Sequence, residues 1–134
     1  MRLVIDASVA TEASLADEGL GPLAGHDLLG PALLLSEAVS VIRELAWRGA
    51  IPPEHAISSL QRLLALPVRI ESPDGHYSLA TEVAETLGWA KTYDAEYVAL
   101  AMASGAPLVT LDDKLRRGAG HLVQILKPDD VRAA

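Results

Sequence analysis

Two aspartates directly follow short apolar segments that have the length and composition of buried strands. Asp6 comes after Leu3-Val4-Ile5, and Asp112 comes after the segment 108–111. Functional groups in open parallel sheets lie at the carboxyl ends of the strands, so acids in these two positions indicate a site. Carboxylate oxygens bind hard divalent cations, which polarise phosphodiesters and lower the pKa of bound water. The spacing therefore indicates an acidic, cation-binding edge of a sheet.

Each candidate acid also has an explanation that involves no chemistry. Asp6 can start a turn or cap the helix after it, and Asp94 has the position of a helix N-cap. The Asp112-Asp113 pair can cap a short helix in the same way. Glu37 falls on the polar face of its helix, where a solvated glutamate is the default. Composition and periodicity leave both explanations open.

The apolar pattern divides the chain into short strands and longer helices. We expect strands at 2–5, 68–71, 108–111 and 123–126. We expect helices at about 8–18, 32–48, from the prolines at 52–53 to 66, from 75 to 87 and 94–104, with a short helix carrying 114–117. Ser8 is the expected cap of the first helix, and residues 25–30 are expected to form a loop.

This order of elements predicts one α/β domain over residues 1–134, with a parallel sheet and helices on both faces. The long stretch between the first two expected strands holds two or three helices, so strands and helices do not strictly alternate. No internal repeat, low-complexity tract or linker interrupts the chain.

Composition excludes several classes of protein. The chain has no cysteine, which rules out disulfides, thiolate metal sites and cysteine nucleophiles. The net charge of −7 argues against a general nucleic-acid binder, unless several of the acids are gathered around a cation. Half of the residues are hydrophobic, which is enough for one core. Spare apolar surface would indicate a partner or a self-association face, but the many alanines also explain the high hydrophobic fraction.

No segment has the pattern of a targeting or membrane sequence. The apolar run before Asp6 is too short for a signal peptide, and the apolar stretch 31–51 is interrupted by charged residues. We therefore expect a soluble, cytoplasmic protein that does not associate with membranes.

Four segments of the chain resemble, in their order, the signature segments of the PIN-domain family, and most closely its VapC-type toxins. They are LVIDAS (3–8), PALLLSEAVSVIREL (31–45), TYDAEYVALA (92–101) and PLVTLDDKL (107–115). TYDAEYVALA is the most specific of them, and the resemblance covers nearly the whole chain. It implies a three-layer α/β/α domain with a central parallel sheet.

The resemblance also implies the site. Its metal-binding and catalytic acids would be Asp6, Glu37, Asp94 and Asp112, which hold Mg²⁺ or Mn²⁺. Auxiliary residues would be Asp113, Thr110 and Ser8. Two carboxylates ~5 Å apart repel by roughly 3 kcal/mol at an effective dielectric constant near 20, so four converging acids need protons or a cation. The stretch 10–12, Ala-Thr-Glu, departs from the basic or polar residues that family members often carry there.

Basic residues flank two of these acids. Lys91, Lys114, Arg116 and Arg117 are placed to contact RNA phosphates, although a solvated charged turn explains each of them as well. The histidines lie at positions 26, 55, 76 and 121 without metal-ligand spacing. We expect all four to be surface or loop residues.

By this resemblance the chain would be an endoribonuclease toxin, a homodimer silenced by a small antitoxin that covers or fills the active site. The apolar helices 32–46 and 56–66 are candidate binding faces, and a place in the buried core explains either of them equally well. One alternative is a PIN-like interaction module without catalysis. Another is a receiver-type phospho-acceptor domain, but Asp6 lacks the acidic neighbour that such domains need, and no aspartate lies between Asp27 and Asp74.

Overall fold

Five short parallel strands form one sheet of order β3-β2-β1-β4-β5 in the computed structural model, which describes all 134 residues. The strands are β1 (Arg2–Ile5), β2 (Asp27–Gly30), β3 (Val68–Ile70), β4 (Leu108–Val109) and β5 (Ile125–Leu126). The central strand β1 pairs with β2 on one side and β4 on the other. Its last three residues are fully buried because helices cover both faces of the sheet.

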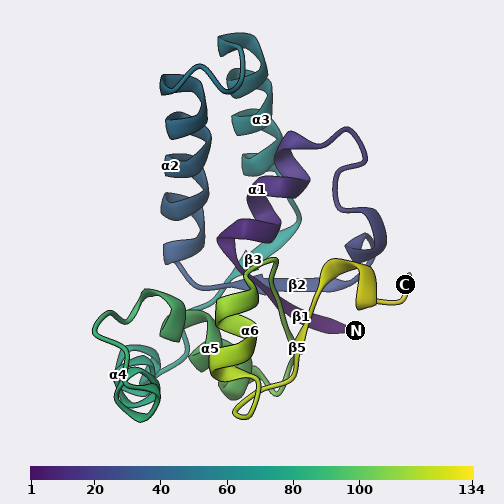
Figure 1. Cartoon of the computed structure of the whole chain (residues 1–134). Coiled ribbons are helices and arrows are strands. Elements are labelled where there is room, and N and C mark those ends of the chain that lie inside the picture. Colours follow the sequence, from purple (N-terminus) through teal and green to yellow (C-terminus); the bar gives the residue numbers. More distant parts are fainter.

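Six helices form the outer layers. They are α1 (Ala7–Leu15), α2 (Leu33–Trp47), α3 (Pro53–Ala65), α4 (His76–Leu87), α5 (Tyr93–Ser104) and α6 (Asp113–Ala119). Figure 1 shows α1, α2 and α3 on one side of the sheet and α4, α5 and α6 on the other. The predicted three-layer α/β/α architecture is confirmed.

Helix α5 lies deepest in the molecule. All seven residues from 95 to 101 are buried, so this helix is apolar around most of its circumference rather than along one stripe. Three of the seven are alanines, whose small side chains let α5 pack closely against α4 and the strands of the sheet. Because Asp94 immediately precedes this buried segment, its position is set by the core.

Helices α2 and α3 form a hairpin that extends away from the sheet (Figure 1). Gly49 has a φ of +71° at the turn and its N–H bonds to Ala46 O, which ends α2. Pro53 then starts α3, where its missing N–H costs nothing. The hairpin exposes large apolar side chains, among them Trp47, Ile57 and Leu64. None of the chain's helices combines the length and the apolar character needed to cross a membrane.

Four details of the predicted elements are wrong. Residues 25–30 contain strand β2 rather than a loop alone, and both leucines of this strand are buried because helices cover both faces. The first helix ends at Leu15 rather than near residue 18, and its N-cap is Asp6 rather than Ser8. The predicted strand 108–111 ends at Val109, after which the chain turns toward α6.

Candidate active site

Asp6 lies at the carboxyl end of the central strand and is held by three hydrogen bonds. Its Oδ1 accepts from the Ser8 hydroxyl at 2.6 Å and from the Val9 N–H at 3.1 Å, which caps α1. Its Oδ2 accepts from the Thr110 hydroxyl, at the end of the neighbouring strand β4. The capping explanation is therefore correct, and the cap fixes the carboxylate at the sheet edge.

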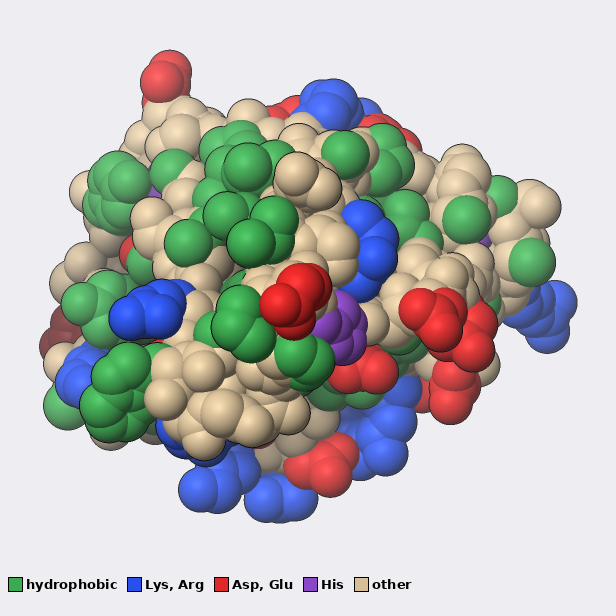
Figure 2. All heavy atoms as spheres, turned by 90° about the horizontal axis from the view of Figure 1, so that it is seen from above, with side chains coloured by type: hydrophobic (Ala, Val, Ile, Leu, Met, Phe, Trp, Pro, Cys, Tyr) green, Lys and Arg blue, Asp and Glu red, His purple; other side chains and the backbone are tan.

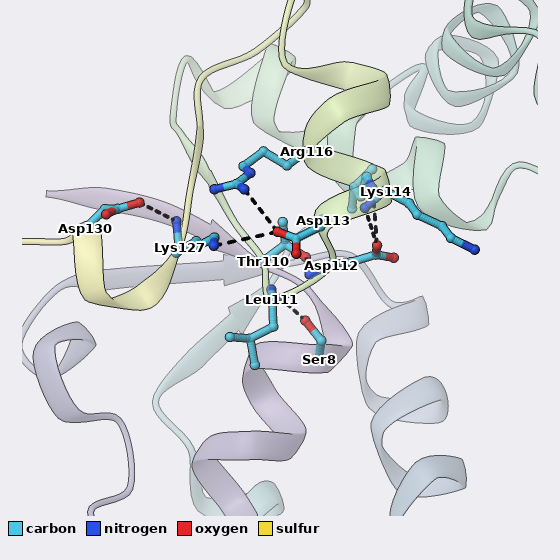
Figure 3. Close-up of polar contacts among 10 residues, drawn as sticks. Ser8, Thr110, Leu111, Asp112, Asp113, Lys114, Arg116, Lys127 and Asp130 are labelled. Atoms are coloured by element: carbon cyan, nitrogen blue, oxygen red, sulfur yellow. Dashed lines mark hydrogen bonds and ion pairs between the residues drawn. The ribbon is translucent and has the colours of Figure 1, made fainter.

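The two hydroxyls that bind Asp6 also anchor the loop after β4. Ser8 Oγ accepts from the Leu111 N–H at 3.1 Å, as Figure 3 shows. Thr110 Oγ1 accepts from the Asp112 N–H at 3.0 Å. Each hydroxyl thus donates to Asp6 and accepts from this loop, which uses its single hydrogen and one of its lone pairs. The loop that carries Asp112 is tied in this way to the end of β1.

The two neighbouring aspartates face different surroundings. Asp112 caps α6, because its Oδ1 accepts from the Lys114 N–H at 2.8 Å and the Leu115 N–H at 3.3 Å. Asp113 instead pairs with Arg116 at 3.0 Å and Lys127 at 3.7 Å (Figure 3). Of these two aspartates, Asp112 is the one that contributes to the raised pKa of Asp6. Of the pair, Asp112 is therefore the one that belongs to the acidic site.

Glu37 comes to the site from α2 and is held by a residue of α5. The buried Tyr97 donates its hydroxyl hydrogen to Glu37 Oε1. Glu37 is half-buried rather than fully solvated, so the default interpretation of a solvated helix glutamate is wrong. Tyr97 was not among the predicted site residues. Its place three residues after Asp94, on the same side of a helix, is the signal that would have indicated it.

Asp94 lies in the first turn of α5, but it is not the N-cap that its position suggested. The N-cap is Thr92, and α5 begins at Tyr93. The Asp94 carboxylate accepts no hydrogen bond from the protein, unlike those of Asp6, Glu37 and Asp112. It is exposed on the surface beside these acids, and both its oxygens are available to a ligand.

The four predicted acids form one electrostatic group. Desolvation by the surrounding protein, with smaller contributions from the other acids, raises the pKa of Asp6, of Glu37 and of Asp94 above its usual value, although Asp94 is exposed at the surface. Asp112 contributes to the raised pKa of both Asp6 and Asp94, and Asp94 contributes to that of Glu37. The structure therefore brings these four carboxylates, which come from four different parts of the chain, into mutual reach.

The donor set fits a hydrated hard cation. No group of three or more acidic or histidine side chains forms a ready-made metal site. The acids nevertheless leave several oxygens without hydrogen bonds, namely both of Asp94, Oε2 of Glu37 and Oδ2 of Asp112. Oxygens spread in this way suit Mg²⁺, which keeps several of its waters and binds through few carboxylates. Repulsion between these acids contributes to their raised pKa values, and a bound cation would relieve this repulsion.

A second polar pair lies buried between α4 and α5. His76 Nε2 lies 3.2 Å from Glu96 Oε1, and the two residues are only 5% and 7% exposed. The prediction that all four histidines are surface or loop residues is wrong for His76. Glu96 also acts electrostatically on Glu37, which places this pair behind the acidic group.

The predicted phosphate-binding residues differ in whether they already form an ion pair within the protein. Arg116 is bound to Asp113, so part of its charge is already used. Lys91, Lys114 and Arg117 are exposed and form no ion pair. These three cations can bind an anion without breaking an ion pair within the protein.

The fold and this site together define an α/β domain with an acidic edge, and the chain belongs to a known family of such domains. A family model described as PIN domain matches residues 3–120, so the chain is a member of the PIN domain family. The resemblance inferred from the four sequence segments is confirmed.

Named relatives agree with this placement. The chain is 31% identical over 127 residues to Ribonuclease VapC12 of Mycobacterium tuberculosis, covering 92% of this chain and 96% of that protein. It is 35% identical over 114 residues to Ribonuclease VapC9 of the same organism, covering 84% and 87%. The chain therefore lies within the VapC-like part of the family.

Solved structures share the fold at lower identity. PAE2754 from Pyrobaculum aerophilum superposes with a TM-score of 0.72 at 22% identity, over 97% of this chain and 94% of that one. A chain of VapBC2 from Rickettsia felis, solved with a DNA fragment from its promoter, gives 0.66 at 16% identity over 95% and 98%. At these identities the likeness shows the fold alone.

Proposed function

We propose that the chain, as one PIN-domain unit, is a metal-dependent endoribonuclease and the toxin of a toxin–antitoxin pair. The observation that carries the proposal is the convergence of Asp6, Glu37, Asp94 and Asp112 at one sheet edge. The family membership and the relatives named as ribonucleases support it. Asp6 is buried and Glu37 half-buried, and burying carboxylates costs stability in the free protein, which is typical of a site kept for its chemistry.

The four acids have separate roles in this proposal. A bound Mg²⁺ or Mn²⁺ would supply Lewis-acid stabilisation of charge on the phosphodiester. Asp6, Asp94 and Asp112 would hold it, and Ser8 and Thr110 would keep Asp6 in position. Glu37, held by Tyr97, would orient the attacking water as general base. The products would carry 5′-phosphate and 3′-hydroxyl ends, as the resemblance implies.

Cations at the rim would hold the RNA backbone. Lys91, Lys114 and Arg117 form no ion pair and are exposed, so each can donate a hydrogen bond to a phosphate oxygen. Arg116 would contribute after partial release from Asp113. The net charge of −7 argued against binding of nucleic acid. In this proposal the negative charge is gathered at the metal site and free cations surround it, so the protein can still bind RNA.

The antitoxin would bind the α2–α3 hairpin. A hollow of about 420 Å³ between these helices is lined mainly by apolar side chains, including Val39, Ile42, Ile57 and Leu60. Figure 2 looks down on the molecule from the side of this hairpin and shows apolar side chains gathered on that face. Exposed apolar surface of this kind suits the apolar face of a partner helix. In this proposal the protein works in the cytoplasm.

A homodimer is part of the same proposal. Sedimentation of the purified chain, alone and with the product of an adjacent small reading frame, would measure both associations. We expect a dimer for the chain alone and a larger complex with the antitoxin. Ile57→Glu is expected to abolish the larger complex, because it places a charge on the apolar face, and Glu54→Gln on the same helix is the matched control.

The activity is tested with purified protein and a panel of RNAs and DNAs, in Mg²⁺ or Mn²⁺ and in EDTA. We expect RNA cleavage that needs the metal and is lost in Asp6→Asn and Asp94→Asn. Asparagine retains a capping oxygen at position 6, so the first variant is expected to fold. Asp17→Asn, an exposed aspartate just past the far end of α1, is the matched control.

The outcomes separate the competing functions. Cleavage that persists in both variants would defeat the site assignment. A folded protein that cleaves no nucleic acid but still binds an antitoxin would indicate an interaction module. Transfer of phosphate from acetyl phosphate to a single aspartate would revive the receiver-type alternative.

A further inference from the structure

A hollow of about 510 Å³ lies directly beside the acidic residues. Its walls include Glu37 and Asp94 together with Trp89, Lys91 and Tyr93. Small-ligand sites have volumes of roughly 300–1,000 Å³, so the hollow is large enough for a nucleotide. Two candidate catalytic acids, two aromatic rings and one free cation therefore share a single concave surface.

Trp89 is held rigidly at one wall of this hollow. Gly88 ends α4 with a φ of +72°, and the Trp89 N–H then bonds to Ala84 O at 2.8 Å. The indole lies against α6 at Gly118, where an added Cβ would come within 3.3 Å of the ring. The ring is half-buried, and its N–H donates to no protein acceptor. Its position is thus fixed by packing before any ligand binds.

Tyr93 and Lys91 are free to contact a ligand in the same hollow. Tyr93 is 54% exposed, and its hydroxyl forms no hydrogen bond within the protein. Lys91 is exposed and forms no ion pair, although acidic residues lie nearby. An exposed aromatic ring and an unpaired ammonium group beside a nuclease-like site are features of surfaces that bind single-stranded nucleic acids.

We propose that this hollow binds one unpaired RNA nucleotide next to the scissile phosphate, with its base against Trp89 and Tyr93 and its phosphate near Lys91. The inference rests on the proposed ribonuclease function and names the residues of this chain that would hold the unpaired base beside the acids. Every base has a face that stacks on an aromatic ring, so the hollow selects unpaired RNA rather than one base sequence. A base inside a duplex is already stacked and cannot enter.

Fluorescence of Trp89 reports occupancy directly. Trp47, the only other tryptophan, is 76% exposed on α2, so Trp47→Phe leaves Trp89 as the only tryptophan of a folded protein, excited selectively at wavelengths that tyrosine does not absorb. Single-stranded RNA pentamers of A and of U are titrated in Ca²⁺ and in EDTA, and a gel confirms that the RNA stays intact. We expect both pentamers to change the Trp89 emission, while matched duplex RNA and inorganic phosphate leave it unchanged.

Tyr93→Ala tests the second ring without risk to the fold, because this side chain is largely outside the core. We expect roughly 5- to 100-fold weaker binding of the pentamers, the range typical of a lost base–aromatic stack. The KM for RNA should rise with little change in kcat, since the contact binds substrate and transition state alike. Tyr77→Ala, a similarly exposed tyrosine of α4 outside the hollow, is the matched control.

The results for this subsite and for the ribonuclease activity are independent. If wild-type protein cleaves RNA but Trp89 emission is unchanged and Tyr93→Ala behaves like Tyr77→Ala, the subsite is wrong and the proposed function stands. If no RNA is cleaved yet single-stranded pentamers still perturb Trp89, the subsite stands and the proposed function fails. Equal responses to duplex and single-stranded RNA would overturn the inference.

Discussion

Tyr97 of α5 donates its hydroxyl hydrogen to Glu37 of α2, which links two helices from opposite sides of the sheet. Burial and the adjacent Glu37 carboxylate raise the pKa of the Tyr97 hydroxyl far above its usual value, so this group remains a donor. One oxygen of Glu37 is occupied in this way, and Oε2 is left free. The hydrogen bond therefore decides which way the Glu37 carboxylate faces.

Tyr97→Phe is expected to reduce activity without unfolding the protein. The change removes one hydroxyl and keeps the buried ring, so Glu37 loses its orientation while the core keeps its packing. Residues that orient a metal-site group typically affect metal affinity or activity by about 10- to 100-fold, and we expect a loss of that size. Mn²⁺ affinity measured by calorimetry, together with kcat, checks the prediction. Tyr77→Phe is the control, and equal values for the two variants would contradict the positioning role.

Part of the site could be predicted from the sequence because it depends on local chain geometry. Asp6 follows β1 directly and Asp112 lies in the loop after β4, and a strand end in a parallel sheet has a known position. The partner of Glu37 could not be predicted in this way. It depends on how α2 and α5 lie relative to each other across the sheet, and Tyr97 is 60 residues away in the chain. The periodicity of a helix identifies its buried face but not the residue of another element that contacts this face.

Thr110 provides a test of the link between the two strand ends. Its buried hydroxyl donates to Asp6 Oδ2 and accepts from the Asp112 N–H, so Thr110→Val removes two hydrogen bonds at nearly constant volume. We expect the free energy of unfolding to fall by about 1–3 kcal/mol, the usual cost of unsatisfied buried polar groups. Thr110→Ser keeps the hydroxyl and should recover most of this loss and most of the Mn²⁺ affinity. Urea denaturation of the three proteins measures the difference.

The buried His76–Glu96 pair is expected to stabilise the fold. His76→Leu leaves Glu96 buried without its partner, and we expect a loss of about 2–4 kcal/mol in the free energy of unfolding. His76→Gln retains a donor at this position and should lose less. Denaturant unfolding of both variants checks the order. A leucine variant as stable as wild type would mean that the pair contributes nothing.

The same two residues show why the fold was predicted better than the burial of single polar residues. The alternation of apolar strands and helices is a pattern of many residues, and it survives small errors at element ends. The burial of His76 follows from the packing of α4 against α5, which no window of sequence contains. Strand β2 was missed because it has only four residues, and its two leucines are both buried, so no alternation marks it as a strand.

Asp6→Asn should stabilise the metal-free protein and abolish its response to metal. Burial raises the pKa of Asp6, and Asp112 adds to this, so ionised Asp6 is unfavourable in the folded state. Asparagine removes the charge and keeps an oxygen for the cap. We expect a rise in Tm of roughly 2–5 °C in EDTA at neutral pH. Mn²⁺ should raise the Tm of the wild type but not of the variant, since only the wild type gains from binding.

The pH dependence of the Tm of wild type and Asp6→Asn tests independently whether the charge on Asp6 destabilises the folded protein. Folding raises the pKa of Asp6, Glu37 and Asp94, so their favourable contribution is complete only below their unfolded pKa values and is lost as the pH rises through the folded ones. In EDTA, the Tm difference between Asp6→Asn and wild type should therefore be small near pH 4.5 and grow toward pH 7.5, by roughly the shift given above. Asp17→Asn should show no such trend. A difference that is largest at acid pH would mean that Asp6 is stabilised as a carboxylate, and the acids would then need no cation.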